Sequence, residues 1–110
     1  MNKKDVLNMI ETTGLEYKLH KLDVDIEVEL FLNNAYMEYI DKKYEDKLRD
    51  LEMVAEVRRR MTQLLVLINK VNDIEQHAIK LNNHDLMWSC EGRKALMVNQ
   101  MELLRNKYEF

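Results

Sequence analysis

The sequence has no proline, and glycine and cysteine are almost as rare. With glycine only at Gly14 and Gly92, the strongest helix breakers are missing from most of the chain, so turns have to come from Asn and Asp. The single cysteine, Cys90, excludes an internal disulfide and fits a reducing compartment. The longest apolar run, Leu64–Ile68, is far shorter than the ~18 residues of a membrane span. We therefore predict a cytoplasmic protein without a membrane-spanning segment.

The composition is rich in both apolar and charged residues. The chain has 110 residues, of which 46% are hydrophobic and 34% are charged, a mixture typical of long helices and coiled coils. This length predicts one helical domain over residues 1–110. Residues 1–56 carry 8 basic and 14 acidic side chains (net −6), and residues 57–110 carry 9 basic and 6 acidic ones (net +3). Such a layout can favour antiparallel or head-to-tail self-association.

The dominant pattern is one apolar stripe at helical spacing from Leu15 to Ala55. Its members fall on one side of a helix: Leu15, Leu19, Leu22, Ile26, Leu30, Met37, Ile40, Tyr44, Leu48, Leu51 and Ala55. A second sector of the same segment is free of Asp and Glu and contains Tyr17, Val24, Val28, Phe31, Leu32 and Ala35. Two apolar faces on one helix predict neighbours on both sides.

Residues 22–30 also permit another interpretation, because apolar and acidic residues alternate there as in a half-buried strand. We favour the helix, since the helical period extends over a much longer stretch than the alternation. The predicted fold is all-α, with long antiparallel helices in a bundle or a coiled-coil-like assembly. The alternative is an α+β fold with one strand at residues 22–32.

Later segments continue the helical pattern. A heptad-like seam consists of Val54, Val57, Met61, Leu64, Ile68 and Val71, and a last face of Leu86, Cys90, Met97, Met101, Leu104 and Tyr108. The run Leu64–Ile68 is apolar on every side and is predicted to be the most buried part of the fold. Six methionines beside these stripes predict gap-filling in the core or, alternatively, a groove for a partner's helix: Met37, Met53, Met61, Met87, Met97 and Met101.

Helix boundaries are harder to predict. One helix over residues 15–81 would be about 100 Å long, too long for a lone domain of this size to cover. Either the helix breaks or other copies of the chain cover it. A short helix is expected at 3–13, with Gly14 just past its end. Further breaks are expected near Asn33–Asn34 or Arg58–Thr62, at Asn72–Asp73 and at 82–85. Gly92 is expected to be either a kink or the boundary between two shorter helices.

Three consecutive arginines are the first candidate anion-binding site. Arg58, Arg59 and Arg60 point in different directions around a helix, so one can reach a phosphate or carboxylate while the others cover apolar surface. Dimerisation about this point would double the cluster and create a contact for nucleic acid. The alternative is a solvated or ion-paired face.

A second candidate anion site follows Gly92. If a helix began there, free backbone N–H groups would converge with Arg93 and Lys94 as they do in anion sites. Trp88 could stack on a base or on an arginine, or it could belong to the core. The short glycine–lysine pattern is also common in proteins that bind no anion.

Patterns of catalytic metal sites are incomplete in this sequence. His84-Asp85 is similar to the dyad of metal-dependent His-Asp phosphohydrolases, but no Asp follows it. Glu38 and Asp41 have the spacing of half the magnesium site in all-α nucleoside-triphosphate pyrophosphohydrolases, without the upstream Glu-x-x-Glu. A zinc site would have to combine Asp73, His77, His84 and Cys90. We therefore expect no enzyme, metal or cofactor.

The function that these features favour is binding of another protein. Apolar surface in excess of what one small chain can bury predicts a helical homo-oligomer that acts as a regulator or adaptor. The alternative is a binder of nucleic acid or a phosphorylated small ligand, with the arginine and lysine clusters at a subunit junction.

Overall fold

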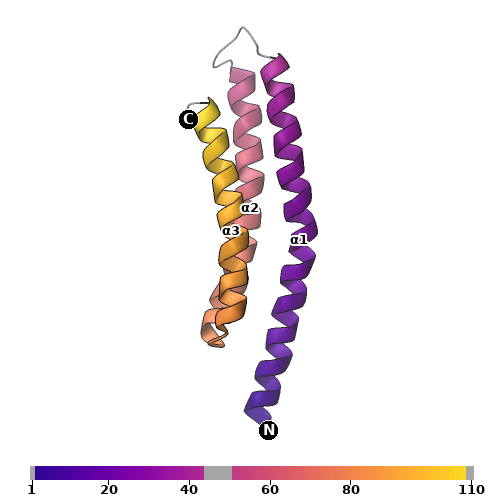
Figure 1. Ribbon diagram of the computed structural model, residues 1–110, viewed down its shortest axis with the longest axis vertical. Helices are drawn as coiled ribbons and strands as arrows, with labels where there is room; N and C mark the ends of the chain where they lie inside the picture. Colours follow the sequence, from indigo (N-terminus) through magenta and orange to yellow (C-terminus); the bar gives the residue numbers. More distant parts are fainter. Residues whose placement is uncertain (1, 44–50, 109–110) are drawn as a thin grey trace.

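The computed structural model describes residues 2–43 and 51–108, which form three helices. They are α1 (Lys3–Lys43), α2 (Leu51–Lys80) and α3 (His84–Tyr108). The helices lie side by side and alternate in direction, so that the molecule is a rod of 66 × 20 × 17 Å (Figure 1). The predicted all-α bundle of long antiparallel helices is confirmed. None of the helices in the described ranges is long and apolar enough to cross a membrane.

The segment with alternating apolar and acidic residues is helical, so the strand alternative at residues 22–32 is wrong. Helical spacing brings Ile26 into the core and Leu22 and Leu30 to its edge. Val24 and Val28 point to the opposite side and remain exposed. An extended strand would place all five on the same face, where this bundle has no second layer to cover them.

Helix α1 passes through two of its predicted breaks. The boundary at Gly14 is wrong, because the residues beyond it pack on α2 and α3 and thereby stabilise the helix that contains it. The break at Asn33–Asn34 is also wrong. Asn33 is fully buried and donates to the carbonyl oxygen of Glu29 at 2.8 Å, and Asn34 accepts from Gln100 of α3 at 3.2 Å. Both asparagines make hydrogen bonds within a continuous helix instead of forming a turn.

The other interior breaks are wrong for a similar reason. Thr62 donates to the carbonyl oxygen of Arg58 at 2.9 Å within an unbroken α2. Asn72 lies further along the same helix and accepts from Lys94 at 3.2 Å. Gly92 is not a boundary between two helices, since α3 runs through it. Interhelical contacts therefore decide where these helices end more than single breaker residues do.

The predicted break at residues 82–85 is confirmed, although His84 and Asp85 already belong to the first turn of α3. Asn82 has a positive φ of 55°, a conformation that asparagine tolerates better than most residues. Its N–H donates to Ile79 and that of Asn83 donates to Ala78, both at 3.0 Å, which is the Schellman pattern of a helix end. The side chain of Asn83 then accepts from the N–H of Leu86 at 3.1 Å and caps α3.

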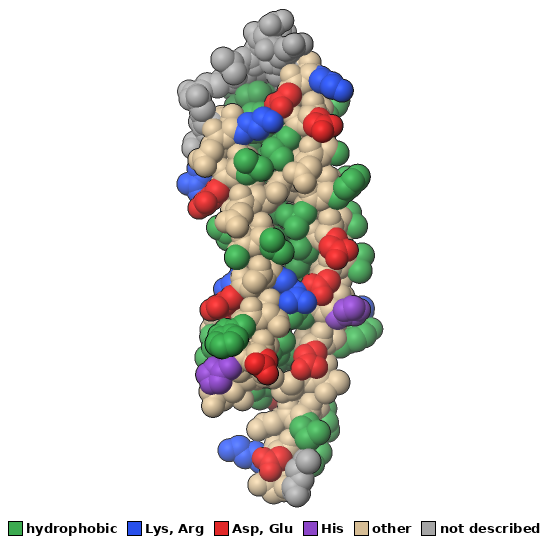
Figure 2. All heavy atoms as spheres, in the orientation of Figure 1, with side chains coloured by type: hydrophobic (Ala, Val, Ile, Leu, Met, Phe, Trp, Pro, Cys, Tyr) green, Lys and Arg blue, Asp and Glu red, His purple; other side chains and the backbone are tan. Residues whose placement is uncertain are grey.

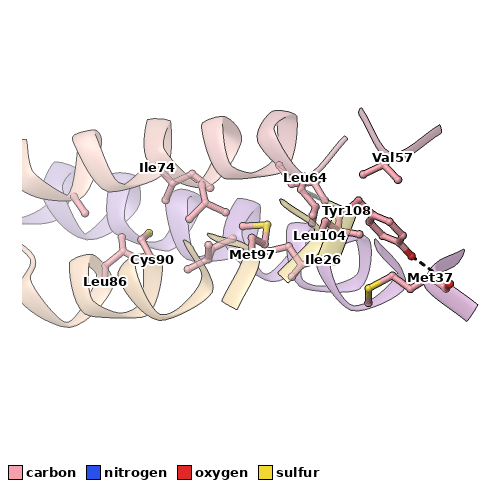
Figure 3. Close-up of a cluster of buried hydrophobic side chains, with 14 of the residues drawn as sticks. Ile26, Met37, Val57, Leu64, Ile74, Leu86, Cys90, Met97, Leu104 and Tyr108 are labelled. Atoms are coloured by element: carbon pink, nitrogen blue, oxygen red, sulfur yellow. Dashed lines mark hydrogen bonds between the residues drawn. The ribbon is translucent and has the colours of Figure 1, made fainter. Parts of the chain in front are cut away.

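The core lies between the three helices along most of the rod (Figure 3). It contains the predicted faces of α2 and α3, including Val57, Leu64, Met97 and Leu104, which are almost fully buried. Tyr108 lies at one end and donates to the carbonyl oxygen of Met37 at 3.3 Å. All six methionines expected to fill gaps lie in the core or against it.

Two parts of the apolar pattern are less buried than expected. In the run Leu64–Ile68, Leu65 and Val66 are half exposed, so the prediction that the whole run is buried is wrong. The long stripe follows the core from Leu15 to Ile40, but Leu51 and Ala55 are exposed on α2. Its members Tyr44 and Leu48 lie outside the described residues.

Candidate interaction surface

The second apolar sector of α1 forms an uncovered surface, which we call the outer face. It consists of Tyr17, Val24, Val28, Phe31, Leu32 and Ala35, all of them exposed. Phe31 has 72% of its surface accessible, an unusually high fraction for phenylalanine. Hydrophobic side chains protrude along the α1 edge of the molecule, at the right of Figure 2. Within one chain, α2 and α3 cover only the other side of α1.

The N-terminal turns of α1 extend the exposed apolar surface. This end of the helix projects beyond the turn that joins α2 to α3 (Figure 1). Val6, Leu7, Met9 and Ile10 are therefore at least 43% exposed. In the part of the chain that the structure describes, neither α2 nor α3 covers these apolar residues.

A smaller apolar surface lies on α3. Trp88, Leu96 and Leu103 are exposed at helical spacing, and Trp88 has 69% of its surface accessible. The idea that Trp88 belongs to the core is therefore wrong. Trp88 and Leu96 border an open groove of about 520 Å³ between α3 and the Ile26–Leu30 segment of α1.

Arg60, one of the candidate anion-binding residues, is buried in a polar cluster between α1 and α2. Its Nη2 donates to Oε1 of Glu29 at 2.6 Å, and its Nε donates to Oδ1 of Asn33 at 3.4 Å. Asn33 in turn donates to the Glu29 carboxylate at 3.3 Å, and the guanidinium lies 5.4 Å from the ring centroid of Tyr36. The anion that Arg60 binds in this structure is the carboxylate of Glu29.

The other candidate cations also contact groups of the same chain. Arg59 donates to the hydroxyl oxygen of Tyr36 at 3.0 Å, and Arg58 is exposed. Lys94 forms a 2.8 Å ion pair with Glu75. Since α3 begins at His84, the backbone N–H groups after Gly92 belong to the interior of a helix. The geometry therefore does not bring Arg93 and Lys94 to a helix N-terminus, and their binding to an external anion stays a prediction.

Arg93 makes a two-point contact with Asp23 of α1. Its Nη2 donates to Oδ2 at 2.9 Å, and its Nε donates to Oδ1. The hydrogen bond from Arg93 holds the pKa of Asp23 below its ordinary value of 3.8, although partial burial acts in the opposite direction. Because the folded pKa is lower than the unfolded one, this pair stabilises the fold at neutral pH. Its contribution is lost as the pH falls below 3.8 through the folded pKa.

Replacing Asp23 by asparagine tests this linkage. We expect the free energy of unfolding to fall by up to about 1 kcal/mol at neutral pH, as for partly exposed ion pairs. The difference between parent and variant should vanish in acid, where Asp23 is protonated in both the folded and the unfolded parent. Urea unfolding followed by circular dichroism at the two pH values measures it. Asp73→Asn, at an exposed position of α2, is the control, and an equal loss at both pH values would contradict the linkage.

Several of the unevenly distributed charges form ion pairs within the chain. Carboxylates of α1 pair with cations of α2 and α3: Glu29 with Arg60, Asp23 with Arg93, and Asp41 with Lys107. These contacts join the acidic first half of the sequence to the basic second half. These ion pairs lie on the side of α1 that packs on the bundle and add to its apolar contacts with α2 and α3.

The thiol of the single cysteine lies inside the core. Cys90 is fully buried, and burial raises the pKa of its thiol, so the thiolate that a nucleophile requires is disfavoured. Across residues 2–43 and 51–108, His, Cys, Asp and Glu side chains form no group of three that could hold a metal ion.

Comparison with known proteins gives no evidence on function, so the outer face of α1 is the main evidence that remains. Neither the family models, nor the curated proteins, nor the solved structures contain a match to the chain. The outer face of α1 is the largest departure from what a self-sufficient small bundle requires.

Glu29 and Asn33 are the important polar residues that sequence reasoning missed. A signal was present, because both occupy the core side of α1 at a spacing of one helical turn, between Ile26 and Met37. A polar pair on a core face requires a polar partner on the facing helix. Arg60 of α2 supplies that partner.

Proposed function

We propose that this protein is a non-enzymatic regulator or adaptor that acts by binding other proteins as a helical homo-oligomer. The observation that supports this most is the outer face of α1, where Phe31 and the two valines are exposed in a row. Burial of apolar surface contributes about 25 cal/mol per Å², so covering this face in an interface is favourable. Contiguous apolar patches of this kind typically mark interaction sites in soluble proteins.

The outer face of α1 and the groove beside Trp88 suit two different roles, self-association and binding of a partner protein. The outer face of α1 is long and regular, as an interface between identical helices requires. The groove beside Trp88 is shorter and is bordered by an exposed aromatic ring, which is the residue type enriched at binding hot spots. Self-association through α1 would leave this groove accessible to the apolar face of a partner's helix.

The non-enzymatic and cytoplasmic parts of the proposal are supported by the ion pairs of the candidate cations and by the single buried cysteine. Arg93 and Lys94 of the second candidate site bind carboxylates of the same chain, and the one thiol lies inside the core. A buried free cysteine without a second cysteine fits the reducing conditions of the cytoplasm.

Size-exclusion chromatography with light scattering tests the homo-oligomer, with Val28→Asp as the decisive variant. Each copy loses about 1.5 kcal/mol of apolar burial, so a dimer should dissociate roughly 100-fold more readily. The matched control is Val66→Asp on α2. Val28 and Val66 are 51% and 47% exposed, so a charge is equally tolerable at both positions in a monomer.

The parent protein and the Val66→Asp variant should therefore be oligomeric at concentrations where Val28→Asp is monomeric. Circular dichroism should show the same helix content in all three proteins. A monomeric parent protein would refute the homo-oligomer. An equal effect of the two substitutions would exclude the outer face as its interface.

A further inference from the structure

Part of the outer face follows the spacing of a coiled coil. From residue 10 to residue 35, positions that alternate in steps of four and three lie on one side of α1. We call them the outer seam: Ile10, Gly14, Tyr17, Lys21, Val24, Val28, Phe31 and Ala35. The opposite side of the same turns holds Leu19, Ile26, Asn33 and Ile40, which are buried in the chain's own core. One helix thus presents a bundle-facing stripe and a separate coiled-coil seam.

We propose that the outer seam packs against the outer seam of a second copy, with the two α1 helices antiparallel and a two-fold axis between Lys21 and Val24. This inference rests on the proposed homo-oligomer and specifies its interface. The axis makes the contact self-complementary, as a closed dimer requires.

Side-chain size supports this register. In it, Gly14 faces Phe31 of the second copy, and Tyr17 faces Val28. No heavy atom other than the local backbone lies within 4 Å of a Cβ built on Gly14, so there is open space where the highly exposed ring of Phe31 would insert. Each large side chain is thus opposed by a smaller one, as in interdigitating helices.

Charge complementarity supports the same register. Lys18 and Asp25 flank the seam on one side, and His20 and Glu27 flank it on the other; all four are exposed. The antiparallel arrangement places Lys18 beside Asp25 of the second copy and His20 beside Glu27, and the two-fold axis repeats both pairs. These are the contacts that set orientation and register in coiled coils.

A parallel arrangement of the same seam is disfavoured. It would place Lys21 directly opposite Lys21 of the second copy within the apolar contact, where like charges repel. In the antiparallel arrangement Lys21 faces Val24 instead. Its Nζ lies 5.2 Å from the ring centroid of Tyr17, so its stem covers the seam while the charge rests on an aromatic face.

The antiparallel register also covers the projecting end of α1. Ile10 would face Ala35 of the second copy, and the turn before it, with Val6, would lie beside Tyr39. Residues that the chain's own bundle leaves exposed would thus be covered by the far half of the second copy's α1.

Cysteine crosslinking tests the register. Tyr17→Cys and Val28→Cys are made separately in a Cys90→Ala background, mixed and equilibrated in a glutathione redox buffer, and analysed without reduction. We expect a disulfide only between the two different variants, because facing positions come within bonding distance. Two copies of the same variant hold their cysteines about 16 Å apart. Val66→Cys mixed with Tyr17→Cys is the control and should not crosslink.

Each outcome of this experiment has a defined meaning. Disulfides between identical variants would show a parallel seam and overturn the proposal. No disulfide in any mixture, with a dimeric Cys90→Ala parent by light scattering, would also overturn it while the homo-oligomer stands. A monomeric parent would refute both.

Charge exchange provides a second test that does not disturb the apolar seam. Lys18→Glu or Asp25→Lys alone should raise the dimer dissociation constant about tenfold, since two attractive pairs become repulsive. The double variant restores both pairs with their signs exchanged and should regain the parent's dissociation constant. If it is weaker than either single variant, the proposed register is wrong.

Discussion

Replacing Arg60 by methionine is expected to lower the free energy of unfolding by about 3–5 kcal/mol, a large part of the stability of a small protein. The Arg60 side chain is buried, and its guanidinium forms the 2.6 Å contact with the Glu29 carboxylate. Without it, a charged group that is only 8% exposed keeps Asn33 as its remaining side-chain partner. Urea unfolding at one fixed protein concentration measures the loss, because self-association adds to apparent stability.

The double variant Arg60→Met/Glu29→Met distinguishes the net contribution of the ion pair from the cost of leaving the Glu29 carboxylate buried without Arg60. Removing both charges leaves no buried ion in this cluster, so the stability of the double variant should return to within about 1 kcal/mol of the parent protein. Arg59→Met is the adjacent control on the exposed side of α2 and should cost less than about 1 kcal/mol. A double variant as unstable as Arg60→Met would contradict this account of the cluster.

Truncating Leu64 to alanine is expected to lower the free energy of unfolding by about 2–5 kcal/mol, because it leaves a cavity in the core. Leu64 has no accessible surface, whereas its neighbour Leu65 is 47% exposed. Leu65→Ala is therefore a matched control with the same chemical change in the same helix. It should cost less than about 1 kcal/mol.

Thermal or urea unfolding of the two alanine variants measures this difference directly. The helix content should be the same in both, since alanine is the best helix former. Equal losses at the two positions would mean that Leu65 is also covered, as it would be if a second copy packed on α2. The comparison therefore also tests whether the proposed self-association would use α1 alone.

Leu64 and Leu65 show which part of the core could be predicted from the sequence. The heptad-like spacing of Val57, Leu64 and Val71 identified the buried side of α2, because apolar residues at that spacing can be covered by one neighbouring helix. The same run also contains Leu65 and Val66. Composition alone predicted them to be buried, and the structure leaves them half exposed.

Helix ends were predictable where several local signals coincided. The turn at residues 82–85 combines asparagines that accept a positive φ with side chains that cap the next helix. Single signals at Gly14, Gly92 and Asn72 were misleading. The cost of one glycine or asparagine inside a helix is about 1 kcal/mol or less, which packing along a long interface readily offsets.

For the candidate anion-binding residues, too, the sequence indicated the residues and only the structure showed their partners. Arg60 and Arg93 were singled out as candidate anion-binding residues, and their partners in the structure are Glu29 and Asp23 of the same chain. Sequence spacing could not reveal this, since 31 and 70 residues separate the partners. Only the packing of α1 on α2 and α3 brings them together.

By itself, the sequence determined that this protein is helical, which sides of its helices are apolar, and that α1 has two such sides. A helical period records which residues share a face, and that is a local property of the chain. The tertiary structure decided which of the two sides of α1 enters the core and which stays exposed. That choice depends on contacts between residues far apart in the chain, both the apolar packing of α1 in the shared core and the ion pairs of its carboxylates with cations of α2 and α3.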